Sequence, residues 1–107
     1  MSPNPPFMAG IPELLVLGLL KSREEMYGYE LVAAIGVATN GVVFLEQGVV
    51  YPLLHELEES GFLKSRNQVI NGRKRTYYAL TSQGIRRLFD LTDDWRRLEG
   101  ALGRVLA

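Results

Sequence analysis

Apolar positions recur at three- and four-residue spacings in several segments of the chain, a pattern typical of buried or amphipathic helices. The first segment predicts a helix from about Pro12 to Lys21, because proline suits a first helical position and Glu13 favours the positive end of the helix dipole. Apolar side chains surround this helix on almost every side. One small domain cannot bury every side of such a helix, so we expect another subunit to cover the remaining side.

Two further helices and a short strand are predicted in the middle of the chain. The stretch from Tyr27 to about Ala38 has one apolar stripe and ends where the sequence turns to Thr, Asn and Gly. Val42 to Leu45 is a brief β-branched and aromatic run, which predicts a strand. A third helix is expected from about Gln47 to Ser60, with Gly61 closing it in left-handed geometry.

The pattern then changes to two strand-like runs, Phe62 to Ile70 and Arg73 to Leu80. They are joined by Asn71-Gly72, the pair best suited to the positive φ angles of a type I′ turn. The sequence therefore predicts a β-hairpin here.

A long helix is expected to follow, capped by the hydroxyl of Thr81 and continuing nearly to Ala107. Its apolar residues alternate at spacings of three and four, which forms a heptad seam. These residues are Leu88, Leu91, Trp95, Leu98, Leu102 and Val105.

The order of elements predicts a mostly α protein with a small β-hairpin, in the α+β class: a winged helix-turn-helix with an extra N-terminal helix and a long C-terminal dimerisation helix. Residues 1–10, with three prolines, are expected to form a flexible arm. Residues 11–81 would be the winged-helix DNA-binding domain, and residues 82–107 the dimerisation helix.

Charge is distributed unevenly, although the 107 residues carry no net charge. Residues 1–63 hold two basic and eight acidic groups, whereas residues 64–87 hold seven basic groups and no acidic one. A phosphate backbone responds to local charge, because salt screens interactions beyond about 10 Å. The basic segment therefore keeps nucleic acid open as a partner.

Other classes of protein find little support. The chain has no Cys, so neither a disulfide nor a thiolate metal site is possible. His55 is its single histidine, and we expect no metal and no cofactor. No catalytic triad or phosphate-cradling glycine loop stands out, so an enzyme is not expected. The apolar run Leu14 to Leu20 is too short to span a membrane, and a cytoplasmic location is the default.

The candidate DNA-binding residues lie on the third helix and the hairpin. Base contact in such motifs comes from the N-terminal half of the recognition helix, and a cationic hairpin can follow the phosphates. Tyr51 could instead be a core aromatic with a wet hydroxyl, and the cations could be a solvated hairpin tip. The predicted residues are Gln47, Gly48, Val49, Tyr51, Arg66, Arg73, Lys74 and Arg75.

Three stretches resemble successive signatures of the PadR family: LGLLKSREEMYGYEL (Leu17 to Leu31), YPLLHELEESGFL (Tyr51 to Leu63) and GRKRTYYALTSQG (Gly72 to Gly84). The resemblance implies a dimeric winged-helix repressor that acts near its own gene and is released by a small molecule or another signal. The chain's length is similar to that of the smaller, multidrug-responsive subfamily. Where the family often has Gly-Thr-Leu-Tyr-Pro, this chain has Val49 and Val50 after Gly48, so a relative's operator sequence cannot be borrowed.

The dimer interface is predicted on the first and last helices. A Trp near a two-fold axis can meet its symmetry mate, and two indoles can flank a planar aromatic ligand. The small PadR proteins have a Trp at the place of Trp95 and an acidic residue four positions later, where this chain has Glu99. This resemblance implies an effector site at Trp95 and Glu99. The alternative is that Trp95 serves only in dimer packing. The predicted interface comprises Leu14, Leu17, Leu88, Leu91, Trp95, Leu98, Leu102 and Val105.

Together these features predict a homodimeric transcriptional regulator that binds an inverted repeat in double-stranded DNA. The rival interpretation is a winged-helix dimer used for protein recognition, which would need no clustered charge on the hairpin.

Overall fold

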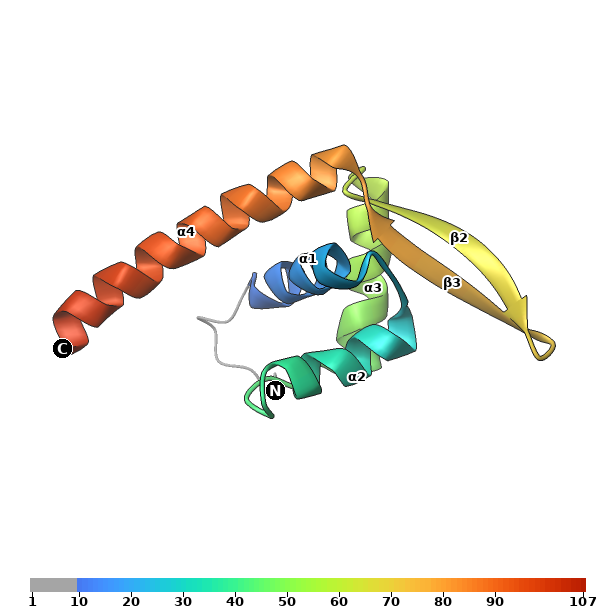
Figure 1. Ribbon diagram of the computed structural model, residues 1–107, viewed down its shortest axis with the longest axis horizontal. Coiled ribbons are helices and arrows are strands. Elements are labelled where there is room, and N and C mark those ends of the chain that lie inside the picture. The colour runs from blue at the N-terminus through green and yellow to red at the C-terminus, as the bar shows by residue number, and fades with distance from the viewer. Residues whose placement is uncertain (1–9) are drawn as a thin grey trace.

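The computed structural model describes residues 10–107 of the chain. The arm predicted over residues 1–10 lies outside the described residues, except for Gly10. The elements, in chain order, are α1 (Ile11–Arg23), β1 (Glu25–Tyr27), α2 (Gly28–Ala38), α3 (Gln47–Glu59), β2 (Leu63–Ile70), β3 (Arg73–Leu80) and α4 (Ser82–Leu106). The predicted winged helix with an added helix at each end is confirmed (Figure 1).

Three helices enclose the core beside the base of the sheet. Each contributes the face that its apolar spacing predicts, and these side chains are almost completely withdrawn from solvent. Burial of each such side chain contributes about 1.5–3 kcal/mol relative to exposure. The fully buried members are Val16, Leu17 and Leu20 of α1, Met26, Leu31 and Ile35, and Val50 and Leu54 of α3.

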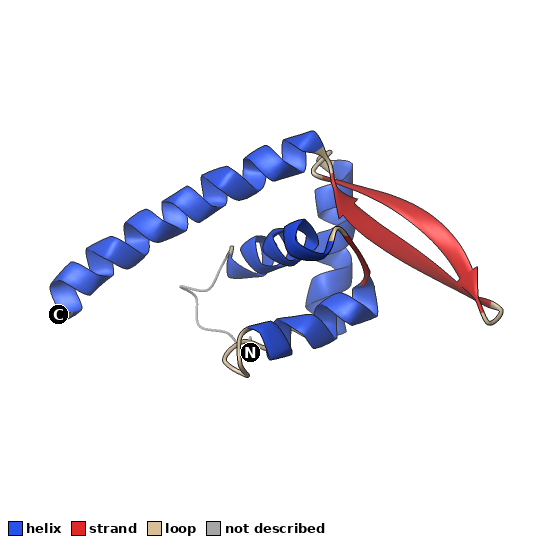
Figure 2. Ribbon diagram, in the orientation of Figure 1, coloured by secondary structure: helices blue, strands red, loops and turns tan. Residues whose placement is uncertain are grey.

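The sheet is antiparallel, with strand order β1-β3-β2, and β2 and β3 extend well beyond β1 as a free hairpin (Figure 2). The two central residues of its turn, Asn71 and Gly72, have φ angles of 52° and 77°. The predicted type of turn, with two positive φ values, is therefore confirmed. We call this hairpin, residues 63–80, the wing.

The strand predicted over Val42 to Leu45 is wrong, and the third strand lies earlier, at β1. Val43 finds its partners in the preceding turn: its N–H donates to Thr39 Oγ1 at 3.0 Å, and the Thr39 hydroxyl lies 3.1 Å from Val43 O. Since one side chain bonds both polar groups of Val43, the segment does not join the sheet. β1 is only three residues long, too short to show a period-two pattern.

A close backbone contact fixes the start of α4 to the end of α3. The predicted Thr81 cap is present, with Gly84 N donating to Thr81 Oγ1 at 3.0 Å, and the same hydroxyl donates to Gly61 O at 2.6 Å. A Cβ at Gly84 would lie 2.0 Å from Phe62 O, so only glycine allows this approach. From this joint α4 extends past α1 on the side away from the wing (Figure 1).

Candidate nucleic-acid interface

The wing presents its cations at and near its tip. Arg73 and Lys74 follow the turn directly and are exposed. Arg75 is half-buried because its guanidinium lies over the ring of Tyr27, 4.5 Å from the ring centroid. Two of the three predicted cations therefore face solvent, and the third is held in one orientation by a cation–π contact.

The first turn of α3 is the second exposed part of the predicted site. Gln47, Gly48 and Val49 all lie on the surface, whereas Val50 enters the core. The N-cap residue, Glu46, makes no side-chain bond to this turn. The amides of Val49 and Val50 donate to Glu46 O, so those of Gln47 and Gly48 remain available to an outside acceptor.

Gly48 has no packing role within the described residues. A Cβ there would meet no atom within 4 Å, and its φ is not in the left-handed region. Glycine inside a helix costs roughly 0.5–1 kcal/mol relative to alanine. Its presence on this exposed turn is consistent with close approach by another molecule.

Tyr51, on α3, lines a cavity together with residues of the wing. Its ring packs against the start of α2, where a Cβ on Gly28 would come within 2.4 Å of Tyr51 Cε1. The ring borders a cavity of about 270 Å³ that we call the crease. The crease is lined by Tyr27, Gly28, Tyr51, His55, Lys74, Arg75, Thr76 and Tyr78.

Arg66 is placed differently from the other predicted cations. It lies on β2 near the base of the wing, where Nε donates to Glu25 Oε2 at 2.7 Å and a second nitrogen donates to the other carboxylate oxygen. Its guanidinium also stacks over Tyr77 at 4.7 Å. The hydrogen bond from Arg66 lowers the pKa of Glu25 below its ordinary value, and coulombic attraction acts in the same direction. The charge of Arg66 is thus matched within the protein.

A second ion pair connects α1 to α4. Arg87 donates to both oxygens of Glu13, with distances of 3.0 and 3.1 Å from Nη2, and its guanidinium also lies near the ring of Phe62. Of the seven basic residues between 64 and 87, Arg66 and Arg87 are therefore paired with carboxylates. The cations of the wing tip are not ion-paired within the described residues.

The predicted dimer residues divide into two groups. Leu17 and Leu88 are buried within the protomer's own core, so they offer almost no surface to a second chain. Leu98, Leu102 and Val105 are 51%, 48% and 80% exposed along the distal half of α4. Leu14 and Leu91 are half-buried, and Trp95 is 38% exposed.

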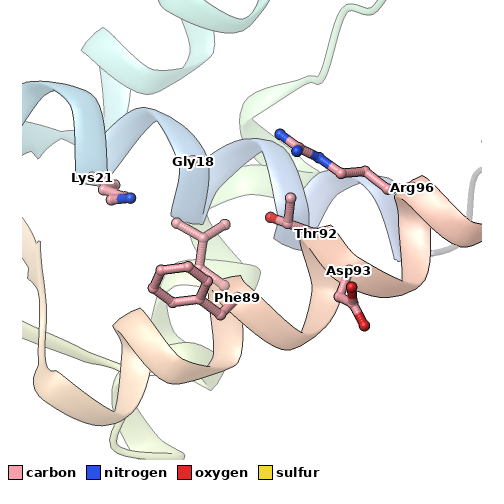
Figure 3. Close-up of a pocket in the computed structure, with 7 residues that line it drawn as sticks. Gly18, Lys21, Phe89, Thr92, Asp93 and Arg96 are labelled. Atoms are coloured by element: carbon pink, nitrogen blue, oxygen red, sulfur yellow. The ribbon is translucent and has the colours of Figure 1, made fainter.

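Among the described residues, three hollows are lined by both α1 and α4, and the two larger ones contain or adjoin the predicted effector residues. One, of about 650 Å³, brings Trp95 and Glu99 to the same groove, with Leu14 and Gly18 on its other wall. The other, of about 360 Å³, places Lys21 of α1 over the ring of Phe89 on α4, 5.2 Å from its centroid (Figure 3). The predicted effector residues are therefore neighbours in space.

Within residues 10–107, no helix combines the length and apolar character that a membrane crossing requires. The same residues contain no group of three or more His, Cys, Asp or Glu side chains that could hold a metal ion.

Sequence reasoning missed several residues of this region. Glu25, which binds Arg66, lies 41 positions away from it, and no local pattern links the two. Tyr27, Thr76 and Tyr78 join Tyr51 in the crease only through the pairing of β1 with β3 and the packing of α3. The sequence offered one signal of this packing: a glycine, Gly28, at the start of a predicted helix, where a missing side chain allows another residue to come close.

A helix-turn-helix whose sheet extends into an exposed cationic hairpin defines the winged-helix class. Residues 16–94 match the transcriptional regulator PadR-like family. The chain belongs to that family, and the resemblance seen in the sequence is confirmed.

Two curated relatives illustrate the match. The Escherichia coli transcriptional regulator YqjI is 38% identical over 78 residues, which are 73% of this chain and 36% of that protein. The Mycobacterium tuberculosis transcriptional regulator Rv3488 is 42% identical over 59 residues, 55% of this chain and 52% of the relative. The chain therefore spans about a third to a half of the length of these relatives.

Solved structures agree with the fold. A PadR family transcriptional regulator from Eggerthella lenta superposes with a TM-score of 0.79 at 34% identity, covering 94% of this chain and 85% of that one. Bacillus subtilis PadR in complex with operator DNA gives a TM-score of 0.69 at 25% identity, covering 78% of this chain and 46% of that one.

Proposed function

We propose that the chain binds double-stranded DNA through α3 and the wing and regulates transcription as a homodimer. The observation that carries this proposal is that one domain exposes both the cationic tip of the wing and the first turn of α3. Each phosphate that a cation neutralises releases counterions and strengthens binding. The similar fold of B. subtilis PadR, solved with operator DNA, supports the same use of the elements.

The glutamates of α3 do not oppose this assignment. Glu56, Glu58 and Glu59 lie in the C-terminal half of the helix, away from its first turn. Glu58 also accepts a hydrogen bond from the Ser65 hydroxyl on β2. In this proposal Gln47 and Val49 read base edges, whereas Arg73 and Lys74 contact phosphates.

The dimer would form through α1 and the exposed part of α4. Leu98, Leu102 and Val105 leave an apolar stripe uncovered in the protomer. A two-fold contact along this stripe would set two recognition helices about one DNA turn, roughly 34 Å, apart. The operator would then be an inverted repeat.

Repression and its release are a further part of the proposal. The groove that holds Trp95 and Glu99 has an aromatic wall and is lined by one carboxylate and by the cation of Arg96, so a planar aromatic ligand is the effector that suits it. A ligand there would release DNA only if it binds more tightly to a dimer arrangement that cannot bind DNA than to the arrangement that can. If Trp95 serves packing alone, its fluorescence will not respond to such ligands.

A footprint on the DNA that flanks the protein's own gene would identify the operator. Fluorescence anisotropy on that duplex should then show binding that weakens steeply with salt. Salt-insensitive binding to a protein partner, with none to DNA, would favour the alternative of a protein-recognition module.

A further inference from the structure

The crease is a cavity to which both α3 and the wing contribute side chains. It lies between α3, which would enter the major groove, and the wing, which would follow the backbone. On a bound duplex, a cavity in this position would face the sugar-phosphate strand that separates the two contacts. Its volume is about 270 Å³.

The side chains around the crease can donate hydrogen bonds, and two are cationic. Lys74 and Arg75 come from β3, while Tyr51 and His55 stand one turn apart on α3. None of the eight described residues that line it is Asp or Glu. Arg75 is already oriented by its contact with Tyr27, so an anion would meet a partly ordered set of donors.

Carboxylates near the crease are engaged elsewhere. Glu30 accepts a hydrogen bond from the Tyr27 N–H at 3.1 Å, and Glu58 accepts one from Ser65. Neither side chain lines the cavity. The charged side chains that line the cavity, Lys74 and Arg75, are both cationic and favour an anion.

Tyr78 forms the inner wall of the crease. The residue as a whole is 4% exposed and lines the cavity. Among the described residues, no side-chain N or O atom is both buried and without a hydrogen-bond partner, so the unbonded hydroxyl of Tyr78 opens to solvent and can donate to an outside acceptor. Burial, and then Glu58 and Tyr51, raise the pKa of Tyr78 above its ordinary value. Like any tyrosine, it is protonated at neutral pH and can donate.

We propose that the crease binds one phosphate group of the DNA backbone, with Tyr78, Tyr51, His55, Lys74 and Arg75 as donors. This inference rests on the proposed DNA binding and adds a defined site for a single phosphate. Gly28 belongs to the same construction, since any side chain there would displace the Tyr51 ring from the wall of the crease. The occupant is a diester of the duplex, and free inorganic phosphate is the other source of the same chemistry.

The test replaces single phosphates of the footprinted duplex with neutral methylphosphonates and measures Kd at each position. For the wild type, one position in each half-site should weaken binding on the order of tenfold, the effect of losing a hydrogen bond to a charged group. Tyr78→Phe should abolish most of that penalty. Tyr77→Phe is the matched control, because its ring contacts Tyr27 and Arg66 and does not line the crease.

His55→Gln is a second variant on the exposed side of the crease, and it should reduce the same penalty if Tyr78→Phe disturbs folding. An unchanged penalty in folded variants that still bind the duplex would overturn the crease assignment and leave the proposed function intact. A wild type that binds no duplex would overturn both. Inorganic phosphate that shifts the NMR signals of His55, with no position-specific penalty, would overturn the assignment to the backbone.

Discussion

The wing and α4 both project from the helical core, but their side chains find partners in different ways. On the wing, Arg66 is bound by Glu25, and Arg75 lies over Tyr27. Along α4, the large apolar side chains beyond Leu91 remain substantially exposed, and only Gly84 and Leu88 are buried. The wing thus matches much of its charge within the protomer, whereas α4 leaves its distal apolar side chains uncovered.

This difference separates two tasks. A polar hairpin with a solvated tip can meet a charged ligand without prior assembly, because its fold does not depend on that ligand. An apolar stripe on a long helix is stable in water only when it is covered. We therefore expect changes on α4 to act on assembly, and changes on the wing to act on DNA affinity with the fold preserved.

The largest expected effect is that of Leu98→Glu. A carboxylate placed twice in a symmetric apolar contact loses the burial of two leucines and adds the cost of two desolvated charges. The dimer Kd should rise at least about 100-fold, which sedimentation at micromolar concentration would show as a monomer. DNA affinity should fall with it, because the two recognition helices would no longer be joined.

Arg97→Glu is the matched control for that prediction. It adds the same carboxylate one position earlier, at a residue whose side chain is mainly in solvent. Sedimentation should still find a dimer. A wild-type monomer, or a dimeric Leu98→Glu protein, would show that the stripe on α4 is not the interface.

The next effect concerns the wing tip. Replacing Lys74 and Arg75 by Ala should weaken DNA binding about 10- to 100-fold at low salt and reduce the salt slope by about one, since both side chains line the crease and would share one phosphate, and each neutralised phosphate contributes close to one. Circular dichroism should be unchanged. Lys64→Ala, at the base of β2, is the control, and an equal loss there would assign the effect to net charge alone.

Much of the fold could be predicted from local chemistry. Asn71-Gly72 determines the turn of the wing, Thr81 marks the start of α4, and Gly61 follows the end of α3, each through a rule that concerns only neighbouring residues. The short strand was misplaced because Val43 bonds to a side chain in its own turn, so its β-branched composition does not decide its conformation.

The candidate site was less predictable, because its charges are balanced by distant residues. Arg66 was grouped with the wing cations on the basis of sequence proximity, yet Glu25 pairs with it across the sheet. Leu17 and Leu88 were assigned to the interface from helical spacing, which does not distinguish a residue buried by its own chain from one awaiting a partner. Such distinctions require the packing of the whole domain.

Smaller and more selective effects are expected on α3. Gln47→Ala and Val49→Ala should each change the ranking of operator variants by about 1–3 kcal/mol at one base pair in each half-site, because direct base contacts contribute that much discrimination. Anisotropy titrations with a panel of single-base variants would measure this. A uniform loss across the panel would indicate that these residues position the helix without reading bases.

The smallest expected effect separates Arg66 from the exposed cations. Since its charge is already matched by Glu25, Arg66→Ala should weaken DNA binding less than Lys74→Ala does, by no more than about threefold. The variant Glu25→Gln should change DNA affinity in the opposite direction. It frees the Arg66 guanidinium to contact the DNA backbone and removes a negative charge from the same face. Binding should become about two- to threefold tighter, with a slightly steeper salt slope.

The pH dependence of this pair is defined by the lowered pKa of Glu25. Because the folded-state pKa lies below the unfolded value, the stabilisation from the pair is present above the ordinary carboxylate range and is lost as the pH falls through the lowered pKa. Wild type and Glu25→Gln should therefore differ by a constant factor in DNA affinity between pH 6 and pH 8. If Glu25→Gln instead weakens DNA binding while the chain remains folded, the ion pair orients the wing on the duplex, and Arg66 acts through its position at the base of the wing.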